Sequence, residues 1–402
     1  MRQGWVETTL GESCEFYNGK AHENQIDDKG KFIVVNSKFI SSDGRTRKKT
    51  RQALFPLYKN DIVMVMSDVP NGKALAKCYL IEEDNKYSLN QRICVIRSNK
   101  FNTKFLYYHL NRHPHLLSFD NGENQTNLRK NDILKCPLYL PPLPEQKRIV
   151  AILDEAFEGI ERAIANTKKN LANSRELFES YLNAIFTQKG EGWVEKKLGD
   201  LCKNVEYGSS AKSLVEGEIP VLRMGNIQDG AIDWSNLVYT IDPEEINKYL
   251  LKYNDVLFNR TNSDVHVGKA AIYKGETPAI FAGYLIRIHR KEELIDADFL
   301  NFYLNSYTAR EYGRSIMGRS VNQANINGTK LKGYPISLPS LSIQKQIVEN
   351  LSFLRTETQR LEAIYRQKID ALNELKQSIL QKAFTGELTA DTPKTVKEEL
   401  AA

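Results

Sequence analysis

Apolar residues recur every three or four positions over two long stretches of the chain, 149–185 and 347–379. This spacing is close to the seven-residue repeat of a coiled coil, in which one stripe of each helix faces a partner helix. Both stretches far exceed the roughly 8–20 residues of a typical globular helix. We therefore expect two long helices that pack on each other as an antiparallel coiled coil; two core helices of a globular bundle are the alternative. The stripe of the first helix comprises Ile149, Leu153, Ala156, Ile160, Ala163, Thr167, Leu171, Ser174, Phe178, Tyr181 and Ile185.

The segment that opens each helix occurs twice, as "LPPLPEQKRIVAIL" at 140–153 and "LPSLSIQKQIVENL" at 338–351. Further pairs precede them: "GWVETTLGESC" with "GWVEKKLGDLC", "SDVPNGKA" with "SDVHVGKA", and "NQTNL" with "NQANI". The separation between copies drifts along the first part of each half and is constant afterwards. Drift indicates insertions in loops, which tolerate them. The chain is therefore predicted to be a tandem duplication.

Short apolar runs alternate with turn residues before each long helix, as in "DIVMVM" (61–66) and "DVLFNR" (255–260), and a helix-like segment follows. This pattern predicts the α+β class, with two similar domains, two long helices between and after them, and pseudo-two-fold symmetry. Pro144 is expected in the first turn of its helix, Ser342 as an N-cap, and Gly190 and Gly386 just past the helix ends. The expected boundaries are domain 1 at 1–143, helix 1 at 144–190, domain 2 at 191–340, helix 2 at 341–388 and a disordered tail at 389–402.

Composition narrows the class of protein. The 402 residues carry a formal net charge of +6, which is compatible with a nucleic-acid partner without requiring one. The five cysteines are odd in number and show no CxxC spacing, which favours a reducing compartment. No run of eighteen apolar residues occurs, so we expect a cytoplasmic protein with no membrane span.

Sequence signatures of catalysis are missing from the chain. It has no GxxxxGKS/T phosphate loop, no GxGxxG, no HExxH and no NPPY-like methyltransferase tetrapeptide. The histidines of "HLNRHPH", His109, His113 and His115, suggest a metal site, but no cysteine or carboxylate nearby completes a ligand set. A polar helix end is the favoured interpretation, and no catalytic or metal-binding residue is expected.

The layout closely resembles the specificity subunit of type I restriction–modification systems. The resemblance covers essentially the whole chain and depends on the ordered pairs above, on "VLRMGNIQDGAID" (221–233) and on the terminal "LQKAFTGEL" (380–388). It implies a non-catalytic subunit whose two target-recognition domains each read one half of a bipartite, asymmetric site in double-stranded DNA. It also implies two methyltransferase subunits, docked on the coiled coil that sets the spacer, and two restriction subunits. No cofactor is expected in this chain; S-adenosylmethionine, ATP and Mg are expected on the partners.

Candidate DNA-binding residues fall into three groups. Basic residues of "RTRKKTR" and of the two SDVxxGKA loops, taken as equivalent, are expected to contact phosphates; a solvated loop and a structural turn are the alternatives. Polar residues of the repeated NQ segments, with a neighbouring arginine, can pair with base edges, although a shared turn is slightly favoured. Unshared polar residues are better candidates for specificity. In that order the groups are Arg45, Arg47, Lys48, Lys49, Arg51, Lys73 and Lys269; Asn124, Gln125, Asn322, Gln323 and Arg319; and Arg223, Asn226, Arg260, Asn262, Asn36 and Lys38.

Partner subunits are expected on the exposed sides of the helix starts, at Glu145, Gln146, Lys147, Arg148, Gln344 and Lys345, where a solvated helical face is the alternative. At the second helix Ile343 stands where the first has Glu145, a departure expected to weaken either one partner contact or the start of this helix. Two rival functions stay open: a stand-alone DNA-binding regulator or structural DNA clamp without an enzyme partner, and an enzyme with unfamiliar motifs. Co-expression with a methyltransferase subunit distinguishes the first of these from a specificity subunit.

Overall fold

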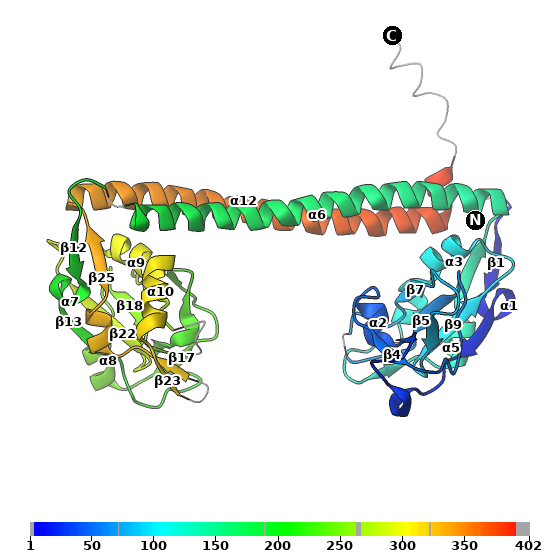
Figure 1. The fold of residues 1–402 in the computed structure, drawn as a ribbon, viewed down its shortest axis with the longest axis horizontal. Coiled ribbons are helices and arrows are strands. Elements are labelled where there is room, and N and C mark those ends of the chain that lie inside the picture. The colour runs from blue at the N-terminus through cyan, green and yellow to red at the C-terminus, as the bar shows by residue number, and fades with distance from the viewer. Residues whose placement is uncertain (1–3, 71, 189, 263–266, 321–322, 391–402) are drawn as a thin grey trace, which may run out of the picture. The chain divides into compact units, whose positions relative to one another are not determined.

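The computed structural model describes residues 4–70, 72–188, 190–262, 267–320 and 323–390. The chain forms two compact units: unit 1 contains the residues up to Asn166 and from Ile369 onward, and unit 2 contains Thr167–Lys368. Each unit combines one mixed domain with a section of each of two long helices, α6 (Leu143–Thr187) and α12 (Leu341–Thr385) (Figure 1).

Unit 1 is built on a four-stranded antiparallel sheet with the order β2-β9-β5-β7 and a three-stranded sheet with the order β4-β3-β8. Two strand pairs, β1·β11 and β6·β10, complete it. The strands are β1 (Val6–Thr9), β2 (Glu15–Asn18), β3 (Phe32–Val35), β4 (Lys48–Thr50), β5 (Ile62–Val65), β6 (Ser67–Asp68), β7 (Cys78–Leu80), β8 (Tyr87–Leu89), β9 (Ile93–Arg97), β10 (Thr126–Asn127) and β11 (Pro137–Leu140). The helices are α1 (Leu10–Ser13), η1 (Glu23–Gln25), α2 (Ser37–Ser41), α3 (Thr103–Leu110), α4 (Pro114–Leu117) and α5 (Lys130–Leu134).

Unit 2 repeats this topology. Its four-stranded sheet has the order β13-β22-β18-β20, its three-stranded sheet β17-β14-β21, and β12 pairs with β25. The strands are β12 (Val194–Lys197), β13 (Cys202–Tyr207), β14 (Ile219–Leu222), β15 (Ile227–Gln228), β16 (Ala231–Ile232), β17 (Val238–Thr240), β18 (Val256–Asn259), β19 (Thr261–Asn262), β20 (Ala270–Ile272), β21 (Ile280–Phe281), β22 (Leu285–Arg290), β23 (Gly318–Ser320), β24 (Gln323–Asn325) and β25 (Pro335–Leu338). The helices are α7 (Leu198–Leu201), η2 (Met224–Asn226), α8 (Pro243–Tyr249), α9 (Ala297–Asn305), α10 (Tyr307–Ile316) and α11 (Gly328–Lys332). The predicted pair of similar α+β domains is confirmed.

The central strands form because both of their faces are covered. In β5, Ile62 and Met64 join one hydrophobic core with Phe105 of α3, whereas Val63 and Val65 join a second core with the other sheet. Successive side chains of a strand point to opposite faces, so a strand covered on both sides is apolar throughout. Strand β18 repeats the arrangement, with Val256 and Phe258 on one face and Leu257 on the other.

The long helices pack in opposite directions within each unit (Figure 1). In unit 1, the ammonium of Lys376 on α12 lies 2.9 Å from a carboxylate oxygen of Glu161 on α6. In unit 2, Arg175 of α6 donates to Glu362 of α12 through two bonds of 2.8 Å. The residue number on α12 falls as that on α6 rises, so the expected antiparallel pairing is confirmed.

The predicted stripe is wrong near the end of α6. Tyr181 was placed in it but is 42% exposed, whereas Leu182 and Phe186 are buried. The reason is that this end of α6 packs on its own unit's domain: the Phe186 ring lies 5.3 Å from that of Phe299 and 5.4 Å from that of Tyr303. That contact turns the buried stripe by one residue.

The helix ends differ slightly from expectation. Helix α6 starts one residue before Pro144, at Leu143. Helix α12 starts at Leu341, where the Ser340 hydroxyl accepts the Ile343 N–H at 3.5 Å, so Ser340 and not Ser342 is the capping residue. Gly386 follows α12 with a φ of 82°, the left-handed value that favours glycine at a helix end. The short helix η3 (Glu387–Thr389) follows, and most of the expected tail, 391–402, lies outside the described residues.

Candidate nucleic-acid interface

The basic segment of unit 1 lies on a tightly bonded turn between α2 and β4. The Asn36 side chain caps α2 by accepting the Phe39 N–H at 2.9 Å. Asp43 and Gly44 then adopt positive φ values of 51° and 75°, which reverse the chain after the helix. The Ser42 hydroxyl accepts the Thr46 N–H at 2.9 Å and closes the turn. The sequence therefore uses Asn36 and Ser42 to shape the loop.

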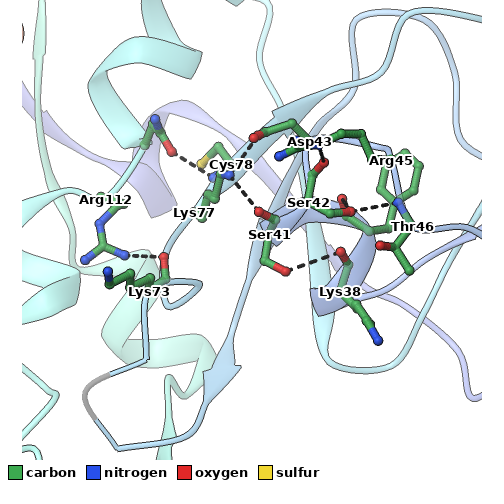
Figure 2. Close-up of polar contacts among 12 residues, drawn as sticks. Lys38, Ser41, Ser42, Asp43, Arg45, Thr46, Lys73, Lys77, Cys78 and Arg112 are labelled. Atoms are coloured by element: carbon green, nitrogen blue, oxygen red, sulfur yellow. Dashed lines mark hydrogen bonds and ion pairs between the residues drawn. The ribbon is translucent and has the colours of Figure 1, made fainter. Parts of the chain in front are cut away.

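Two guanidinium groups of this segment are anchored to the turn. The Nε of Arg45 donates to the Ser42 carbonyl at 2.9 Å (Figure 2). The Nε of Arg47 donates to the Gly44 carbonyl at 2.7 Å. Arg51 pairs with Asp27, so its charge is partly neutralised. Lys48 and Lys49 are exposed on β4, where they pair with Val34 and Ile33 of β3. Arg45, Arg47, Lys48 and Lys49 thus form an exposed basic surface, which is suited to phosphate contacts.

Lys77, directly before β7, supports the same turn (Figure 2). The ammonium of Lys77 lies 2.7 Å from a carboxylate oxygen of Asp43 and donates to the Ser41 carbonyl at 3.3 Å. Nearby, Arg112 donates to the Lys73 carbonyl at 2.5 Å, and the Lys73 side chain itself is exposed. Lys77 therefore stabilises the loop, while Lys73 is available to an external ligand.

The expected equivalence of Lys73 and Lys269 is wrong. The Val65 N–H of β5 donates to the Lys77 carbonyl at 3.0 Å, and the corresponding Asn259 N–H of β18 donates to the Lys269 carbonyl at 2.8 Å. Lys269 is therefore the counterpart of Lys77. The loop between these bonds is shorter in unit 2, so the matching letters of the two SDVxxGKA segments occupy different places in the fold.

The two repeated segments taken as separate candidates pair with each other. In unit 1, β10 of the NQTNL segment pairs with β6 of the SDV segment, with Thr126 opposite Asp68. The Gln125 amide donates to the Ser67 hydroxyl at 2.8 Å, as expected for a shared turn, and Asn124 is exposed.

In unit 2 the equivalent ribbon is larger. Strand β24 pairs with both β19 and β23, which brings Asn262 and Arg319 opposite Ala324 and places Gln323 opposite Ser320. Asn322 lies outside the described residues. Candidates far apart in the sequence thus share one small sheet.

Asn226 is a structural residue in unit 2. It is 3% exposed; its amide oxygen accepts the Arg223 N–H at 2.9 Å, and its amide nitrogen donates to the carbonyls of Asp233 and Ser235 at 2.8 and 3.0 Å. The expectation that its side chain reads a base is wrong, because those groups already hold the loop after β14. The Arg223 guanidinium donates to the Asn236 carbonyl at 2.8 Å and stays half-exposed beside it.

Aromatic residues accompany the arginines of unit 2, and sequence reasoning missed them. The Arg260 guanidinium lies 4.9 Å from the ring centre of Tyr207 and donates to the Gly283 carbonyl at 3.3 Å. Tyr284 is 49% exposed and lines a cavity of about 380 Å³ together with Arg223. No spacing signal marks these tyrosines, since a tyrosine at a strand end is ordinary core composition.

The family model of the type I restriction modification DNA specificity domain matches the chain twice, at residues 2–171 and 190–371. The chain belongs to this family. A putative type I restriction enzyme MjaX specificity subunit from Methanocaldococcus jannaschii is 33% identical over 199 residues, covering 48% of this chain and 46% of that protein. The StySPI specificity subunit of Salmonella potsdam is 29% identical over 68% of this chain and 62% of its own length. The chain thus spans less than two thirds of the length of these two relatives.

Other similarities extend over nearly the whole chain. The EcoDI specificity subunit of Escherichia coli is 24% identical over 96% of this chain and 89% of its own length. A solved chain described under complex assembly and conformational transition of the type I R-M system superposes with a TM-score of 0.78 at 20% identity, covering 96% of this chain and 99% of that chain. The HsdS subunit of Thermoanaerobacter tengcongensis gives a TM-score of 0.57 at 21% identity, covering 96% and 98%. The two structures show a shared fold.

In this family member the glutamines at the helix starts are buried. Gln146 is 1% exposed; its amide oxygen accepts the Asn102 N–H at 2.6 Å, and its amide nitrogen donates to the Pro141 carbonyl at 2.8 Å. Gln344 is 0% exposed and makes the equivalent bonds. Both were expected on an exposed, partner-binding side, and that expectation is wrong because the domain packs on this face. Lys147, Arg148 and Lys345 are exposed, and the Glu145 carboxylate accepts a bond from the Thr389 hydroxyl.

One histidine of the cluster in unit 1, His109, is buried in the core. The His109 ring stacks on Phe384 of α12 at 4.3 Å, and burial lowers the pKa of His109 to about 3. Burial also lowers the pKa of His113 to about 4. Among the described residues no group of three His, Cys, Asp or Glu side chains is placed to hold a metal ion. No helix in the described ranges is long and apolar enough to cross a membrane.

Proposed function

We propose that the chain is the non-catalytic DNA-specificity subunit of a type I restriction–modification enzyme, in which each domain reads one half of a bipartite, asymmetric site. The repetition of one hydrogen-bonded frame carrying different loops supports this most strongly. Val6 pairs with Leu140 in unit 1 as Val194 pairs with Leu338 in unit 2. The loops that follow the equivalent strands β3 and β14 differ: a short α-helix follows β3, and a 3₁₀ turn follows β14. A shared frame with divergent loops suits two readers of different sequences.

The basic surface of unit 1 would bind the DNA backbone. Arg45 and Arg47 are exposed on an anchored turn, and Lys48 and Lys49 are exposed on strand β4, so contacts to phosphates would cost little ordering entropy. Lys73 would extend the same surface. Such contacts position the protein on the duplex without selecting a sequence.

Base selection would come from the loop and strand ends next to these contacts. In unit 2 Arg223 and Arg260 are half-exposed and would offer guanidinium groups to base edges. Asn262, Arg319 and Gln323 of the β19-β24-β23 ribbon are of residue types that can pair with base edges and would be further candidates. In unit 1 the candidates in the corresponding loops are Lys38 on α2 and Asn124 before β10. Asn226 is left out, because its amide is occupied within the fold.

The two long helices would set the spacer and carry the partner subunits. Each has 45 residues, roughly 65–70 Å at 1.5 Å per residue. We propose two methyltransferase subunits that bind S-adenosylmethionine and dock near the exposed Lys147, Arg148 and Lys345, and two restriction subunits that use ATP and Mg. The DNA substrate implies a cytoplasmic location.

A salt titration tests the phosphate contacts. The double variant Lys48→Gln/Lys49→Gln removes two cations, so the slope of log affinity against log salt should fall by about 2, with about the same loss for every DNA sequence. The matched control is Lys168→Gln/Lys169→Gln, which removes two adjacent exposed lysines of α6. Equal losses in both double variants would argue against the basic surface.

Methylation mapping tests the function as a whole. Cells that express this chain with a methyltransferase subunit should acquire methylated adenines at one bipartite site, which disappear when the chain is omitted. Inserting four residues, about one turn, into each long helix should change the spacer and leave both half-sites unaltered. A stand-alone regulator would purify without a bound methyltransferase subunit. An enzyme would modify DNA in the absence of any partner subunit.

A further inference from the structure

Unit 2 contains a cavity of about 560 Å³ whose wall is mostly charged. It lies between the turn at Asp229, the start of β20, the helices α9 and α10, and the sections of α6 and α12 in this unit. Five cationic and three anionic side chains line it, so cations exceed carboxylates by two. They are Arg175, Lys269, Arg310, Arg355 and Arg366, with Glu179, Asp229 and Glu362.

Two of these cations share one carboxylate as their partner. The Glu362 carboxylate accepts both bonds from Arg175 at 2.8 Å and a further bond from Arg366 at 2.8 Å. This three-residue network joins α6 to α12 and has a structural purpose. The other three cations of the cavity, Lys269, Arg310 and Arg355, lie outside this network.

These three cations have no carboxylate partner at hydrogen-bond distance among the described residues. The Lys269 ammonium donates to the Gln228 amide oxygen at 2.8 Å, and Arg355 donates to the main-chain oxygen of Asp229. The Nε of Arg310 is buried and has no hydrogen-bond partner within the part of the chain that the structure describes. Burial is the largest cause that lowers the pKa of each of the three side chains. Their charges have therefore lost hydration that the neighbouring carboxylates only partly replace.

The fold does not require cations without a carboxylate partner here, as unit 1 shows. Lys77, the counterpart of Lys269, is paired directly with Asp43 at 2.7 Å. On the long helix of unit 1, Phe157 and Ile164 stand at the positions that Arg355 and Glu362 occupy relative to the repeated glutamine. Phe157 is buried in the hydrophobic core. The same frame is thus stable with an apolar filling, and the cations of unit 2 need another explanation.

We propose that this cavity binds a phosphate group, held by Arg310, Arg355 and Lys269. Two guanidinium groups and an ammonium supply several donors at fixed angles, which match the oxygens of a phosphate, and its negative charge offsets the excess of cations. The cavity is within the size range of small-molecule sites and exceeds a single phosphate ion, so the group would belong to a nucleotide or to a DNA backbone. The site goes beyond the proposed function, which does not depend on it.

Calorimetry with inorganic phosphate, added to the full chain at constant ionic strength, tests the site. Wild type should bind phosphate, and Arg310→Gln should weaken the affinity about tenfold by removing a charged donor. The matched control is Arg314→Gln on the same helix, because Arg314 is exposed and paired with Glu311. Absence of binding by wild type, or an equal loss in both variants, would overturn the proposal.

A variant that should strengthen phosphate binding excludes misfolding as the cause of weaker binding. Asp229→Asn removes a carboxylate at the cavity wall and should strengthen phosphate binding, since asparagine tolerates the φ of 49° at this position. Weaker binding by this variant would contradict the proposal. The affinity for duplex DNA then identifies the source of the phosphate group. If Arg310→Gln weakens DNA binding, and inorganic phosphate weakens the DNA binding of wild type in the same way, the group belongs to the DNA backbone. If Arg310→Gln leaves DNA binding unchanged, the group belongs to a free phosphate compound. Wild-type DNA binding without phosphate binding would reject this site and leave the proposed function intact.

Discussion

Replacing Gln344 by leucine tests how the recognition domain of unit 2 is held on its helix. The amide oxygen of Gln344 accepts the Asp296 N–H at 2.8 Å. Its amide nitrogen donates to the carbonyls of Leu294 and Pro339 at 3.0 and 2.9 Å. Asp296 is the N-cap of α9. The Gln344 side chain therefore joins the start of α12 to the start of α9. Leucine has a similar volume and can make none of these bonds.

The cost follows from what the substitution leaves unpaired. A buried N–H without a partner costs about 1–3 kcal/mol, and each carbonyl that loses its donor adds a smaller amount. The leucine side chain recovers about 1 kcal/mol or more by burying apolar surface in place of an amide. We therefore expect Gln344→Leu to lower the free energy of unfolding of unit 2 by about 2–3 kcal/mol.

Urea unfolding followed by circular dichroism and tryptophan fluorescence measures this loss. The matched control is Gln346→Leu, which makes the same exchange two residues later, where the glutamine is exposed. Surface substitutions of that kind stay within about 0.5 kcal/mol. If the two variants unfold within about 0.5 kcal/mol of each other, the three bonds do not hold the domain. Gln146→Leu should give the corresponding loss in unit 1.

Three further outcomes are expected from unfolding measurements. Gly208→Ala should cost about 2 kcal/mol or more, because a Cβ there would lie 2.2 Å from a backbone oxygen, whereas Gly225→Ala, with open space around it, should cost under about 1 kcal/mol. His109 stays neutral in the folded state down to about pH 3 while the unfolded chain takes up a proton near pH 6.5, so stability should fall with decreasing pH by up to about 1.4 kcal/mol per unit in this range, and His109→Leu should reduce that slope. Arg175 lowers the pKa of Glu362, so Glu362→Gln should cost about 1 kcal/mol or less at pH 7, and the difference should vanish as the pH falls below that pKa.

The long helices and the duplication could be predicted because they leave periodic signals. A stripe repeated over dozens of residues is a local property of the chain, and so is an ordered set of matching segments. The helix pairing followed, since a long apolar stripe must be covered. Tyr181 shows the limit of this reasoning: where a domain packs on the helix from the side, the buried stripe turns, and periodicity alone contains no information about that domain.

Gln146 and Gln344 could not be recognised as buried for a related reason. In "EQKR" and "IQKQ" each glutamine stands beside charged residues that do face solvent, and a helix with such a composition is normally a solvated face. The burial arises from the N-cap residues Asn102 and Asp296, far away in the sequence, whose N–H groups need an acceptor at that place. A pattern can show that a residue is able to accept a bond, whereas only the tertiary fold supplies the donor.

The lysines of the SDVxxGKA segments show how misleading identical letters can be in loops. Gly268 has a φ of 88° and donates its N–H to Asn259 at 2.9 Å, and the residue of unit 1 that does the same, to Val65 at 3.0 Å, is Ala76 with a φ of 54°. The hydrogen bonds of the neighbouring strands therefore show which residues of the two units are equivalent. The glycines that match in the two sequence segments are not equivalent by this criterion. A sequence motif within a loop can shift by a residue without an energetic cost, whereas a one-residue slip in a strand moves every side chain to the other face.

The same criterion locates the positions at which the two domains would differ in specificity. Strands β3 and β14 each pair in parallel with a neighbour, Val35 opposite Leu89 and Leu222 opposite Phe281. The next residues, Asn36 and Arg223, are then equivalent by backbone geometry. Asn36 caps a regular helical turn, whereas Arg223 begins a 3₁₀ turn fixed by a buried asparagine, so the two loops leave the same strand end along different paths. A frame that fixes where a loop begins, and leaves its course to the loop's own bonds, lets one fold present two unrelated surfaces.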